Sequence, residues 1–254
     1  MTSSTAHPIT RLITGASSGI GLALVQHWLK KDAAVIAVSR HACDSAALTA
    51  LQQQGLPLDC RDVDITDPAQ LETLASSLRE EGQSIEQIIN CAGVLHDQTT
   101  GLTPEKRLEE VNLQNLQQSF AMNTFAPILL ARQLLPLMPR RQPGVFASVS
   151  ARVGSIEDNH LGGWYSYRAS KAAQNQLLRT LAIETRRRYP QLCVLSLHPG
   201  TTDTPLSEPF QRNVPEGKLF SPARSARQLA DIIDNADEND HGRFIAWDGR
   251  DIPW

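Results

Sequence analysis

The sequence predicts an α/β fold in which a seven-stranded, doubly wound parallel sheet forms a single domain. Seven short β-branched apolar runs alternate with longer stretches of helical periodicity. The runs are apolar throughout instead of alternating with polar residues, which is typical of parallel strands covered on both faces. The chain of 254 residues lies at the upper end of one domain and contains no repeat, low-complexity segment or linker that would divide it.

Each element follows from its own stretch of this alternation. The apolar runs are short enough for strands, and the periodic stretches between them are long enough for helices of several turns. Right-handed crossovers place the carboxyl ends of the strands at one edge, where ligands of doubly wound sheets bind. In chain order, strands are expected at 10–14, 34–39, 59–64, 85–90, 144–150, 192–198 and 243–248, and helices at 19–31, 67–81, 108–138, 166–189 and 222–236.

Composition excludes several classes of protein. With 41% hydrophobic and 20% charged residues, the chain is not a disordered one. A net charge of −3 provides no basic face for nucleic acid. No apolar run reaches the ~18 residues of a membrane helix, and residues 1–10 lack the basic and apolar segments of a signal peptide. We therefore expect a cytoplasmic protein that binds neither nucleic acid nor membrane.

The spacing of cysteines and histidines indicates neither a metal site nor a disulfide framework. Cys43, Cys60, Cys91 and Cys193 form no CxxC pair, and the seven histidines show no metal-ligand spacing. In a reducing compartment the four cysteines are expected to be free thiols.

A glycine-rich turn follows the first expected strand and opens an apolar helix. Its spacing is GxxxGxG, and no Gly-Lys-Ser/Thr follows, which excludes a P-loop. Glycines at such a place let the chain turn tightly and let a pyrophosphate approach the amides of the helix N-terminus. An ordinary strand-to-helix turn is the alternative, but the position after the first strand favours a dinucleotide. The residues expected to bind it here are Gly15, Ser17, Ser18, Gly19, Ile20 and Gly21.

The ends of the next strands indicate which dinucleotide binds. An acid after the second strand would hold the ribose hydroxyl of NAD, whereas an arginine accommodates the 2′-phosphate of NADP. Arg40 stands there and no carboxylate does, so NADP is expected, although a solvated loop arginine is the alternative. Asp64 after the third strand could accept a hydrogen bond from adenine. Asn90, Ala92 and Gly93 after the fourth strand would let the cofactor lie against the backbone.

Tyr167 and Lys171 are the candidate catalytic pair. Their spacing of four places both side chains on one face of the helix expected at 166–189. A phenol titrates near ~10, and a neighbouring ammonium favours the phenolate, so the pair is suited to proton transfer between a carbonyl and an alcohol. A tyrosine and a lysine four residues apart are common on surface helices. Only together with the upstream glycine turn does the pair become a strong signal.

These residues resemble the short-chain dehydrogenase/reductase family over essentially the whole chain. The resemblance rests on the turn at 14–21, on Asp64, on the variant of Asn-Asn-Ala-Gly at 90–93, on Asn123 and on YxxxK at 167–171. Pro199 and Gly200, followed by Thr204, complete it. Within the family, the stretches 154–156, 162–171, 198–204 and 247–254 look like those of C-factor and sniffer-type carbonyl reductases.

The resemblance implies a Rossmann-type sheet, NADP(H) and hydride transfer to a small-molecule carbonyl. In the family pattern Tyr167 would donate and accept the proton, Lys171 would lower its pKa and bind the nicotinamide ribose, and Asn123 would hold a water. Pro199, Gly200 and Thr204 would join the cofactor site. Family members pair through long helices, so a homodimer or homotetramer is expected, with apolar surface that includes Leu129, Leu130, Leu134, Leu177, Leu178 and Leu181.

One position departs from the family pattern. The family usually carries Ser-Ser-x-x-Gly after the fifth strand, and its second serine polarises the substrate carbonyl. Alignment on Gly154 places Ala151 at that serine, so Ser150 is the candidate replacement and Ser155 another. Strand alternation points Ser150 to the opposite face unless the chain bulges. The alternative function is an NADP(H)-binding regulatory or signalling protein with little turnover. Substrate recognition is expected in the loop at 201–221.

Overall fold

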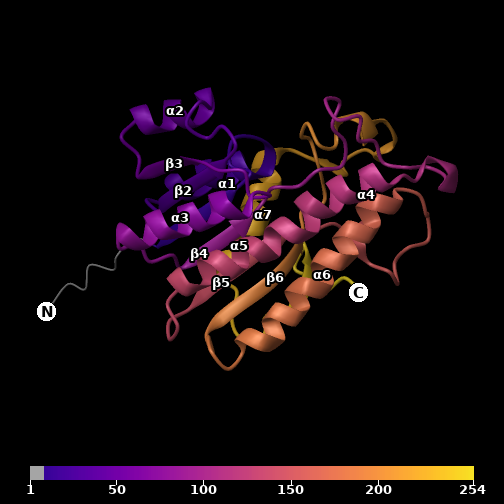
Figure 1. The fold of residues 1–254 in the computed structure, drawn as a ribbon. Helices are drawn as coiled ribbons and strands as arrows, with labels where there is room; N and C mark the ends of the chain where they lie inside the picture. The colour runs from indigo at the N-terminus through magenta and orange to yellow at the C-terminus, as the bar shows by residue number, and fades with distance from the viewer. Residues whose placement is uncertain (1–8) are drawn as a thin grey trace, which may run out of the picture.

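Seven parallel strands form the central sheet of the computed structural model, which describes residues 9–254 (Figure 1). Their order is β3-β2-β1-β4-β5-β6-β9. The chain moves outward from β1 to β3 and then returns to the other side of β1, which creates the reversal of strand order where doubly wound sheets bind ligands. The strands are β1 Thr10–Thr14, β2 Ala34–Ser39, β3 Leu58–Asp62, β4 Gln87–Asn90, β5 Gly144–Val149, β6 Leu192–His198 and β9 Arg243–Ala246.

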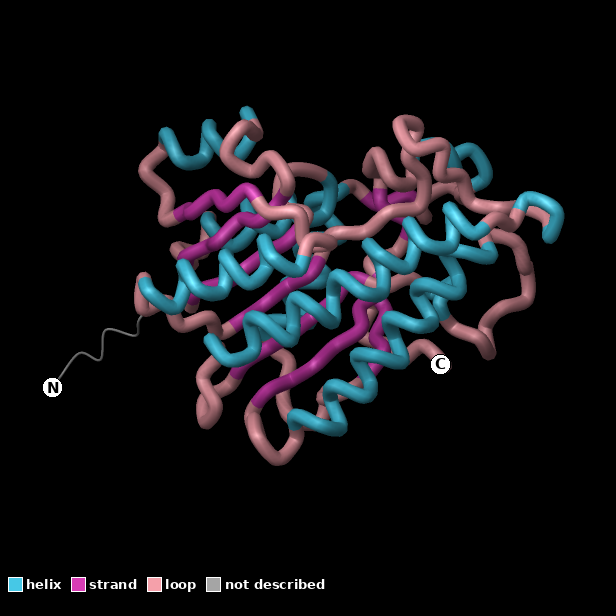
Figure 2. Tube along the Cα trace, in the orientation of Figure 1, coloured by secondary structure: helices cyan, strands magenta, loops and turns pink. Residues whose placement is uncertain are grey.

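Helices cover both faces of the sheet, as the fold class requires (Figures 1 and 2). One buried apolar cluster joins the sheet to α1 and α7 on one face, and a second joins it to α3, α5 and α6 on the other. Because both faces are covered, the inner strands are mostly apolar, whereas the edge strand β3, with the sequence LDCRD, is mostly polar and half-buried. The helices are α1 Gly19–Leu29, α2 Ala46–Gln53, α3 Pro68–Glu80, α4 Leu113–Phe120, α5 Ala126–Leu134, α6 Tyr165–Thr185 and α7 Pro222–Asp234.

A row of polar residues crosses the carboxyl edge of this apolar sheet. The parallel register places Thr14 beside Asn90, Asn90 beside Ser148, and Ser148 beside Ser196. All four residues are buried. Four neighbouring strands therefore turn from apolar to polar at the same level, directly below the loops that follow them.

Two expectations about the helices were wrong. The helix expected at 108–138 is interrupted: α4 and α5 are separated by a π-helical turn, Ala121–Phe125. The sequence AMNTF of this turn contains no proline or glycine that would mark a break, so the pattern did not reveal it. The short helix α2 was missed because eight residues give too little periodicity.

The structure tests the expectations about the cysteines but describes little of the N-terminal segment. The absence of a signal peptide was inferred from residues 1–10, of which 1–8 lie outside the described residues. Within 9–254, no helix combines the length and apolar character needed to cross a membrane. Cys43, Cys60, Cys91 and Cys193 are free thiols, and the described part of the chain contains no cluster of three or more metal-binding side chains.

Candidate active site

The glycine-rich turn between β1 and α1 is packed too closely for side chains. Gly15 has φ +64°, and a Cβ there would lie 2.8 Å from the backbone nitrogen of Ala92. A Cβ on Gly21 would lie 2.2 Å from the carbonyl oxygen of Gly15. The turn after β1 and the loop after β4 therefore touch through backbone atoms, which leaves a smooth surface along which a flat cofactor can lie.

The N-terminus of α1 is suited to hold a pyrophosphate. Ser18 precedes the helix but makes no side-chain cap, and the first turn of α1 contains no acidic residue. The amides of this turn therefore keep their capacity to bind an anion, which the helix dipole also favours. Ser17 and Ile20 lie half-buried on either side of Ser18. A Cβ on Gly19 would lie 3.2 Å from Cγ2 of Thr204, so the loop after β6 reaches the same turn.

The end of β2 carries the features expected of a 2′-phosphate site. The Ser39 hydroxyl oxygen is buried without a hydrogen-bond partner among the described residues. Arg40 is exposed beside it, and no acidic side chain within 9–254 pairs with it. Asp64 after β3 instead accepts hydrogen bonds from the amide (2.9 Å) and hydroxyl (2.6 Å) of Thr66. Its contact with adenine stays a prediction.

Tyr167 and Lys171 lie on one face of α6, as the spacing predicted. Their exposed fractions are 8% and 3%, and the Lys171 Nζ lies 5.9 Å from the centroid of the Tyr167 ring. The same Nζ lies 3.7 Å from the position of a Cβ on Gly93, and Oδ1 of Asn123 lies 3.3 Å from that position. Residues from α6, the loop after β4 and the π-helical turn therefore meet around Gly93.

Burial controls the ionisation of this pair. It raises the pKa of Tyr167 above its usual value and lowers the pKa of Lys171 to about 7. The expected lowering of the Tyr167 pKa by Lys171 is therefore not seen in the protein alone. The reason is that desolvation acts on both groups, and it disfavours the charge of the ammonium as well as that of the phenolate.

Asn123 fixes the loop after β4. Its Oδ1 accepts from the amide of Val94 (2.8 Å), and its Nδ2 donates to the Val94 carbonyl (2.8 Å) and to the Ser170 hydroxyl (3.1 Å). It lies fully buried in the π-helical turn, a local irregularity that is frequent at functional sites. Because its side-chain amide is engaged in this way, a water held by Asn123 stays a prediction.

A buried chain of hydrogen bonds leads from Lys171 into the sheet. Nζ of Lys171 donates to Oε1 of Gln174 (2.9 Å), and Nε2 of Gln174 donates to the Ser148 hydroxyl (2.8 Å). That hydroxyl also accepts from Nδ2 of Asn90 (2.8 Å), whose Oδ1 accepts from the Thr14 hydroxyl (2.6 Å). Asn90 thus links β1 to β5 through its side chain, which leaves only its backbone for a cofactor. Sequence reasoning missed Gln174, although a polar residue on the buried face of an amphipathic helix was a usable signal.

The hydroxyls near Ala151 have other partners. Ser150 donates to Oδ1 of Asn175 (2.7 Å) in α6, and its amide donates to the Leu197 carbonyl (2.7 Å). Ser155 donates to the carbonyl of Trp254 (3.3 Å). Polarisation of a substrate by Ser150 would require its bond to Asn175 to open, and it stays a prediction.

A buried carboxylate caps α6, the helix that carries Tyr167 and Lys171. Glu105 accepts from the amide of Ser166 (3.0 Å) and from its hydroxyl, and the Glu105 carbonyl accepts from the amide of Trp164. Trp164 itself has φ +52°, a left-handed conformation rare for this residue type. Glu105 therefore satisfies amides at the start of α6 and holds Trp164 in place. Nothing in the sequence indicated this role, because Glu105 lies in a loop 61 residues before its partner.

Aromatic side chains from three loops gather beside Tyr167. The Trp164 ring lies edge-on to that of Tyr167 (6.1 Å between centroids) and to that of Phe210 (5.0 Å). The ring of His96 packs against Phe210 at 5.9 Å. Phe210 belongs to the loop expected at 201–221, which contains a short 3-10 helix, Glu208–Asn213. That loop starts beside Gly200 (φ +76°), so Pro199 and Gly200 lie at the carboxyl end of β6, as expected.

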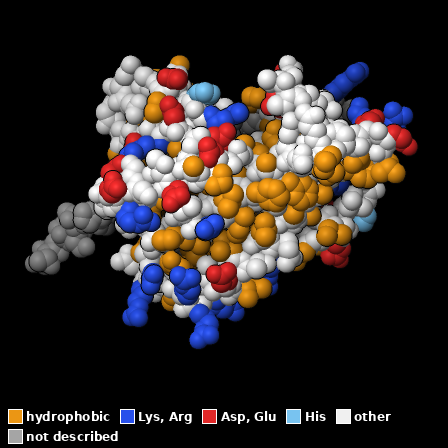
Figure 3. Space-filling model, in the orientation of Figure 1, with side chains coloured by type: hydrophobic (Ala, Val, Ile, Leu, Met, Phe, Trp, Pro, Cys, Tyr) orange, Lys and Arg blue, Asp and Glu red, His pale blue; other side chains and the backbone are white. Residues whose placement is uncertain are grey.

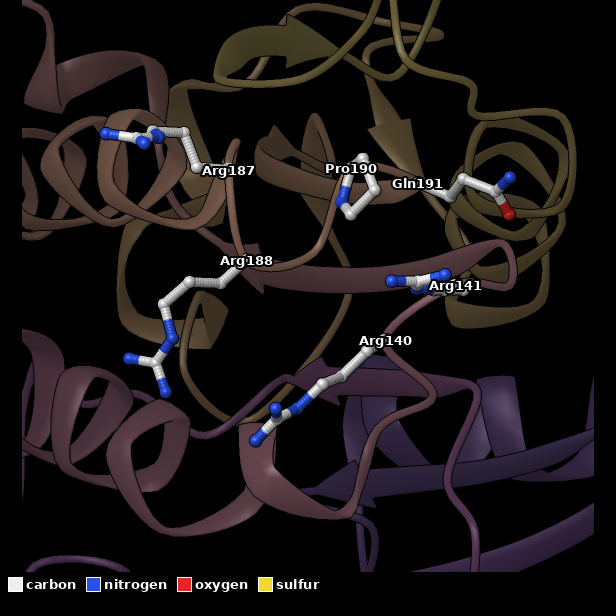
Figure 4. A pocket seen from close by; sticks show the side chains of 6 residues that line it. All are labelled: Arg140, Arg141, Arg187, Arg188, Pro190 and Gln191. Atoms are coloured by element: carbon white, nitrogen blue, oxygen red, sulfur yellow. The ribbon is translucent and has the colours of Figure 1, made fainter.

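A cavity of about 570 Å³ lies at the opposite edge of the sheet, before β5 and β6 (Figure 4). Arg140 and Arg141 line it from the loop before β5, and Arg187 and Arg188 from the end of α6. Their guanidinium groups spread around the cavity, and Arg187 points away from the other three (Figure 4). Cations at this place complement the C-terminal end of the helix dipole, and the cavity takes no part in the site around Tyr167.

Comparison with known proteins identifies the family. The family model described as short chain dehydrogenase matches residues 10–215. The chain is a short-chain dehydrogenase. Members of this family are oxidoreductases, and the matched range contains the glycine turn as well as Tyr167 and Lys171.

This dehydrogenase has relatives with diverse names. It is 30% identical over 247 residues to the 1-hydroxy-2-glutathionyl-2-methyl-3-butene dehydrogenase of Rhodococcus sp. (strain AD45), across 96% of this chain and 99% of that one. It is also 30% identical over 171 residues to the C-signal protein of Myxococcus xanthus, across 67% of this chain and 93% of that one. Among solved structures, the NADPH-bound carbonyl reductase from chicken fatty liver is 26% identical, with a TM-score of 0.82. The match covers 98% of this chain and 100% of that one. The Rossmann-type fold of this dehydrogenase is thereby confirmed.

Proposed function

We propose that this short-chain dehydrogenase reduces a carbonyl group of a small molecule with NADPH, using Tyr167 as the proton donor. The observation that carries the proposal is the placement of Tyr167 and Lys171 on one face of α6, with Nζ of Lys171 3.7 Å from the Cβ position of Gly93 at the carboxyl edge of the sheet. The NADPH-bound carbonyl reductase of the same fold supports the choice of cofactor and reaction.

The residues of the chain fit this cofactor. The free amides of the first turn of α1 would hold the pyrophosphate, and Ser39 and Arg40 would hold the 2′-phosphate. The bare backbone at Gly93 would adjoin the nicotinamide end, beside the Lys171 ammonium. When bound there, NADPH supplies the hydride.

Proton transfer is the part of the reaction that the chain itself performs. A tyrosine phenol is protonated at neutral pH, and burial raises the pKa of Tyr167 further, so Tyr167 holds a proton that it can donate to the carbonyl oxygen as charge develops there. The Lys171 ammonium stabilises the phenolate that remains. The aromatic rings of Trp164 and Phe210 beside Tyr167 provide an uncharged wall for an apolar or aromatic substrate.

A regulatory or signalling protein that binds NADP(H) with little turnover is the alternative. Two observations favour it: Ala151 stands where the family usually carries a serine, and the C-signal protein is a relative. Loss of one such donor costs on the order of 10²-fold in rate.

Oxidation of NADPH against a panel of aldehydes, ketones and quinones separates the two functions. We expect saturable turnover with at least one carbonyl, and its abolition in Tyr167→Phe with the NADPH affinity retained. Tight NADPH binding without turnover on the whole panel would instead support the regulatory function.

We also propose that the enzyme is a cytoplasmic homodimer or homotetramer. The leucines expected to form the contact surface need correction, since Leu130, Leu134, Leu178 and Leu181 are buried in the monomer core. Hydrophobic side chains nevertheless form a band over α4 and α5 (Figure 3). The exposed members of that region include Leu113 and Phe125.

A further inference from the structure

The Lys171 ammonium has only protein carbonyls as its hydrogen-bond partners among the described residues. Nζ donates to Oε1 of Gln174 (2.9 Å) and to the Val149 carbonyl (3.0 Å). An ammonium has three donors and no acceptor, so one N–H remains. Nζ also lies 3.7 Å from the Cβ position of Gly93, a residue of the proposed cofactor site. Two hydrogen bonds, to Gln174 and Val149, thus hold the ammonium, and its third N–H remains for the proposed cofactor site.

The orientation of the Gln174 amide is fixed by its neighbours. Nε2 lies 3.3 Å from the Val149 carbonyl, which can only accept, and 2.8 Å from the Ser148 hydroxyl. The amide nitrogen must therefore face β5, and the amide oxygen must face Lys171. Ser148 is held in turn by Asn90, and every side chain in this network is buried. Gln174 cannot easily rotate away from the ammonium.

We propose that Gln174 is a positioning residue that holds the Lys171 ammonium toward the Gly93 side of the site and stabilises its charged form. The inference rests on the proposed function, because Lys171 affects turnover only in an enzyme that uses Tyr167 as its acid. It adds a residue from the third turn of α6 to the machinery, connected through Ser148 and Asn90 to the centre of the sheet.

No carboxylate faces Lys171 from the elements packed against it, within the part of the chain that the structure describes. The titratable groups that face it are Cys91 after β4 and Tyr167 on α6. Burial raises the pKa of Cys91 to about 12 and raises that of Tyr167, so both are neutral at pH 7. β5 contributes Ser148 and the Val149 carbonyl, and the π-helical turn contributes Asn123, none of which titrates. The carbonyls of Gln174 and Val149 are therefore the groups that accept from the charged form of Lys171, and Gln174 is the one that a substitution can remove.

The pKa of Lys171 can be measured directly in the protein without cofactor. The chain has five lysines, Lys30, Lys31, Lys106, Lys171 and Lys218, so ¹³C-lysine labelling gives few NMR signals, and Lys171→Met identifies the relevant one. We expect Gln174→Leu to lower this pKa by about 1 pH unit, because the ammonium loses an acceptor. Gln174→Glu should raise it by about 1 to 3 pH units, because a carboxylate replaces the amide. Gln176→Leu, an exposed glutamine of the same helix, is the matched control and should leave it unchanged.

Kinetics provide the second readout. In the wild type, kcat should fall as the pH rises through the pKa of Lys171, because the neutral amine no longer stabilises the phenolate. Gln174→Leu should move this fall to lower pH and Gln174→Glu to higher pH, each in step with its NMR titration. A merely structural role would lower kcat at every pH without moving the profile.

The two readouts also separate this inference from the proposed function. Opposite shifts of the Lys171 pKa in the two variants support the role of Gln174 even if no carbonyl is turned over. An unchanged pKa in Gln174→Leu, or shifts in the same direction in both variants, would overturn the inference, whatever the activity of the wild type.

Discussion

At the scale of single residues, Arg40 is the side chain that we propose selects NADPH over NADH. It is exposed beside the buried, unpartnered Ser39 hydroxyl at the end of β2. We expect Arg40→Ala to weaken NADPH binding by about 10- to 100-fold, the loss of about 1.5 to 3 kcal/mol of a charge-assisted hydrogen bond. Binding of NADH should change little, because NADH lacks the 2′-phosphate. Isothermal titration with both nucleotides measures this, and wild-type protein that binds NADH as tightly as NADPH would contradict it.

A second single residue, Ser150, carries the hydroxyl beside Ala151. Because the Ser150 hydroxyl donates to Asn175, we expect Ser150→Ala to lower the free energy of unfolding by about 1 kcal/mol. If the Ser150 hydroxyl stays bound to Asn175 and the donor position at Ala151 is empty, the kcat of Ser150→Ala should stay within a few-fold of the wild type. Ala151→Ser should raise kcat by up to about 10²-fold, because it restores a donor to the substrate carbonyl. Chemical denaturation and steady-state kinetics measure both effects. A 10²-fold loss of kcat in Ser150→Ala would instead make Ser150 the donor.

At the scale of elements, the catalytic helix depends on a cap from a distant loop. Trp164 precedes helix α6 in a left-handed conformation, and its side chain makes no capping hydrogen bond. Glu105 supplies the missing acceptor, and its negative charge also suits the helix N-terminus. The start of α6, and with it Tyr167, is therefore placed by the segment between β4 and α4.

Replacement of Glu105 tests this cap. We expect Glu105→Ala to lower the free energy of unfolding by about 2 kcal/mol, because a helix amide and a buried hydroxyl lose their acceptor. Glu105→Gln, which keeps a carbonyl oxygen as acceptor, should lower the free energy of unfolding by less. Glu109→Ala, at an exposed acidic position nearby, serves as the control in urea denaturation. Equal midpoints for Glu105→Ala and Glu109→Ala would show that the cap contributes nothing.

At the scale of the whole molecule, the hydrophobic band over α4 and α5 is the proposed surface for assembly (Figure 3). Leu113, the first residue of α4, is 68% exposed, and Phe125, the last residue of the π-helical turn between α4 and α5, is 52% exposed. Such a contiguous apolar surface is typical of an interface between subunits.

Light scattering measures this assembly. We expect a particle of two or four times 27.9 kDa for the wild type. The double variant Leu113→Glu with Phe125→Glu should dissociate to the monomer, because charges at an apolar contact are costly to desolvate. Leu161→Glu, at a 92% exposed position in the loop before α6, is the control and should not dissociate it. A monomer mass for the wild type at micromolar concentration would refute the proposal.

The sequence by itself determined the features that depend on neighbours along the chain. The parallel sheet follows from apolar runs of strand length, and the shared face of Tyr167 and Lys171 follows from a spacing of one helical turn. The need for glycine at Gly21 follows from the tight turn between β1 and α1, where a Cβ would lie 2.2 Å from the Gly15 carbonyl oxygen. Local periodicity also gave one wrong prediction, a single helix at 108–138, where the structure has α4 and α5 separated by the π-helical turn.

Only the tertiary structure decided which polar groups meet. Gln174 reaches Ser148 over 26 residues, Asn90 reaches Ser148 over 58, and Thr14 reaches Asn90 over 76. These partners come together because the strand order, not the sequence order, places β1, β4 and β5 side by side in register. Burial in turn sets the ionisation of Lys171 and Tyr167, and it reversed the expected lowering of the Tyr167 pKa. The physical reason is that desolvation depends on everything packed around a group, which no spacing of residue types along the chain contains.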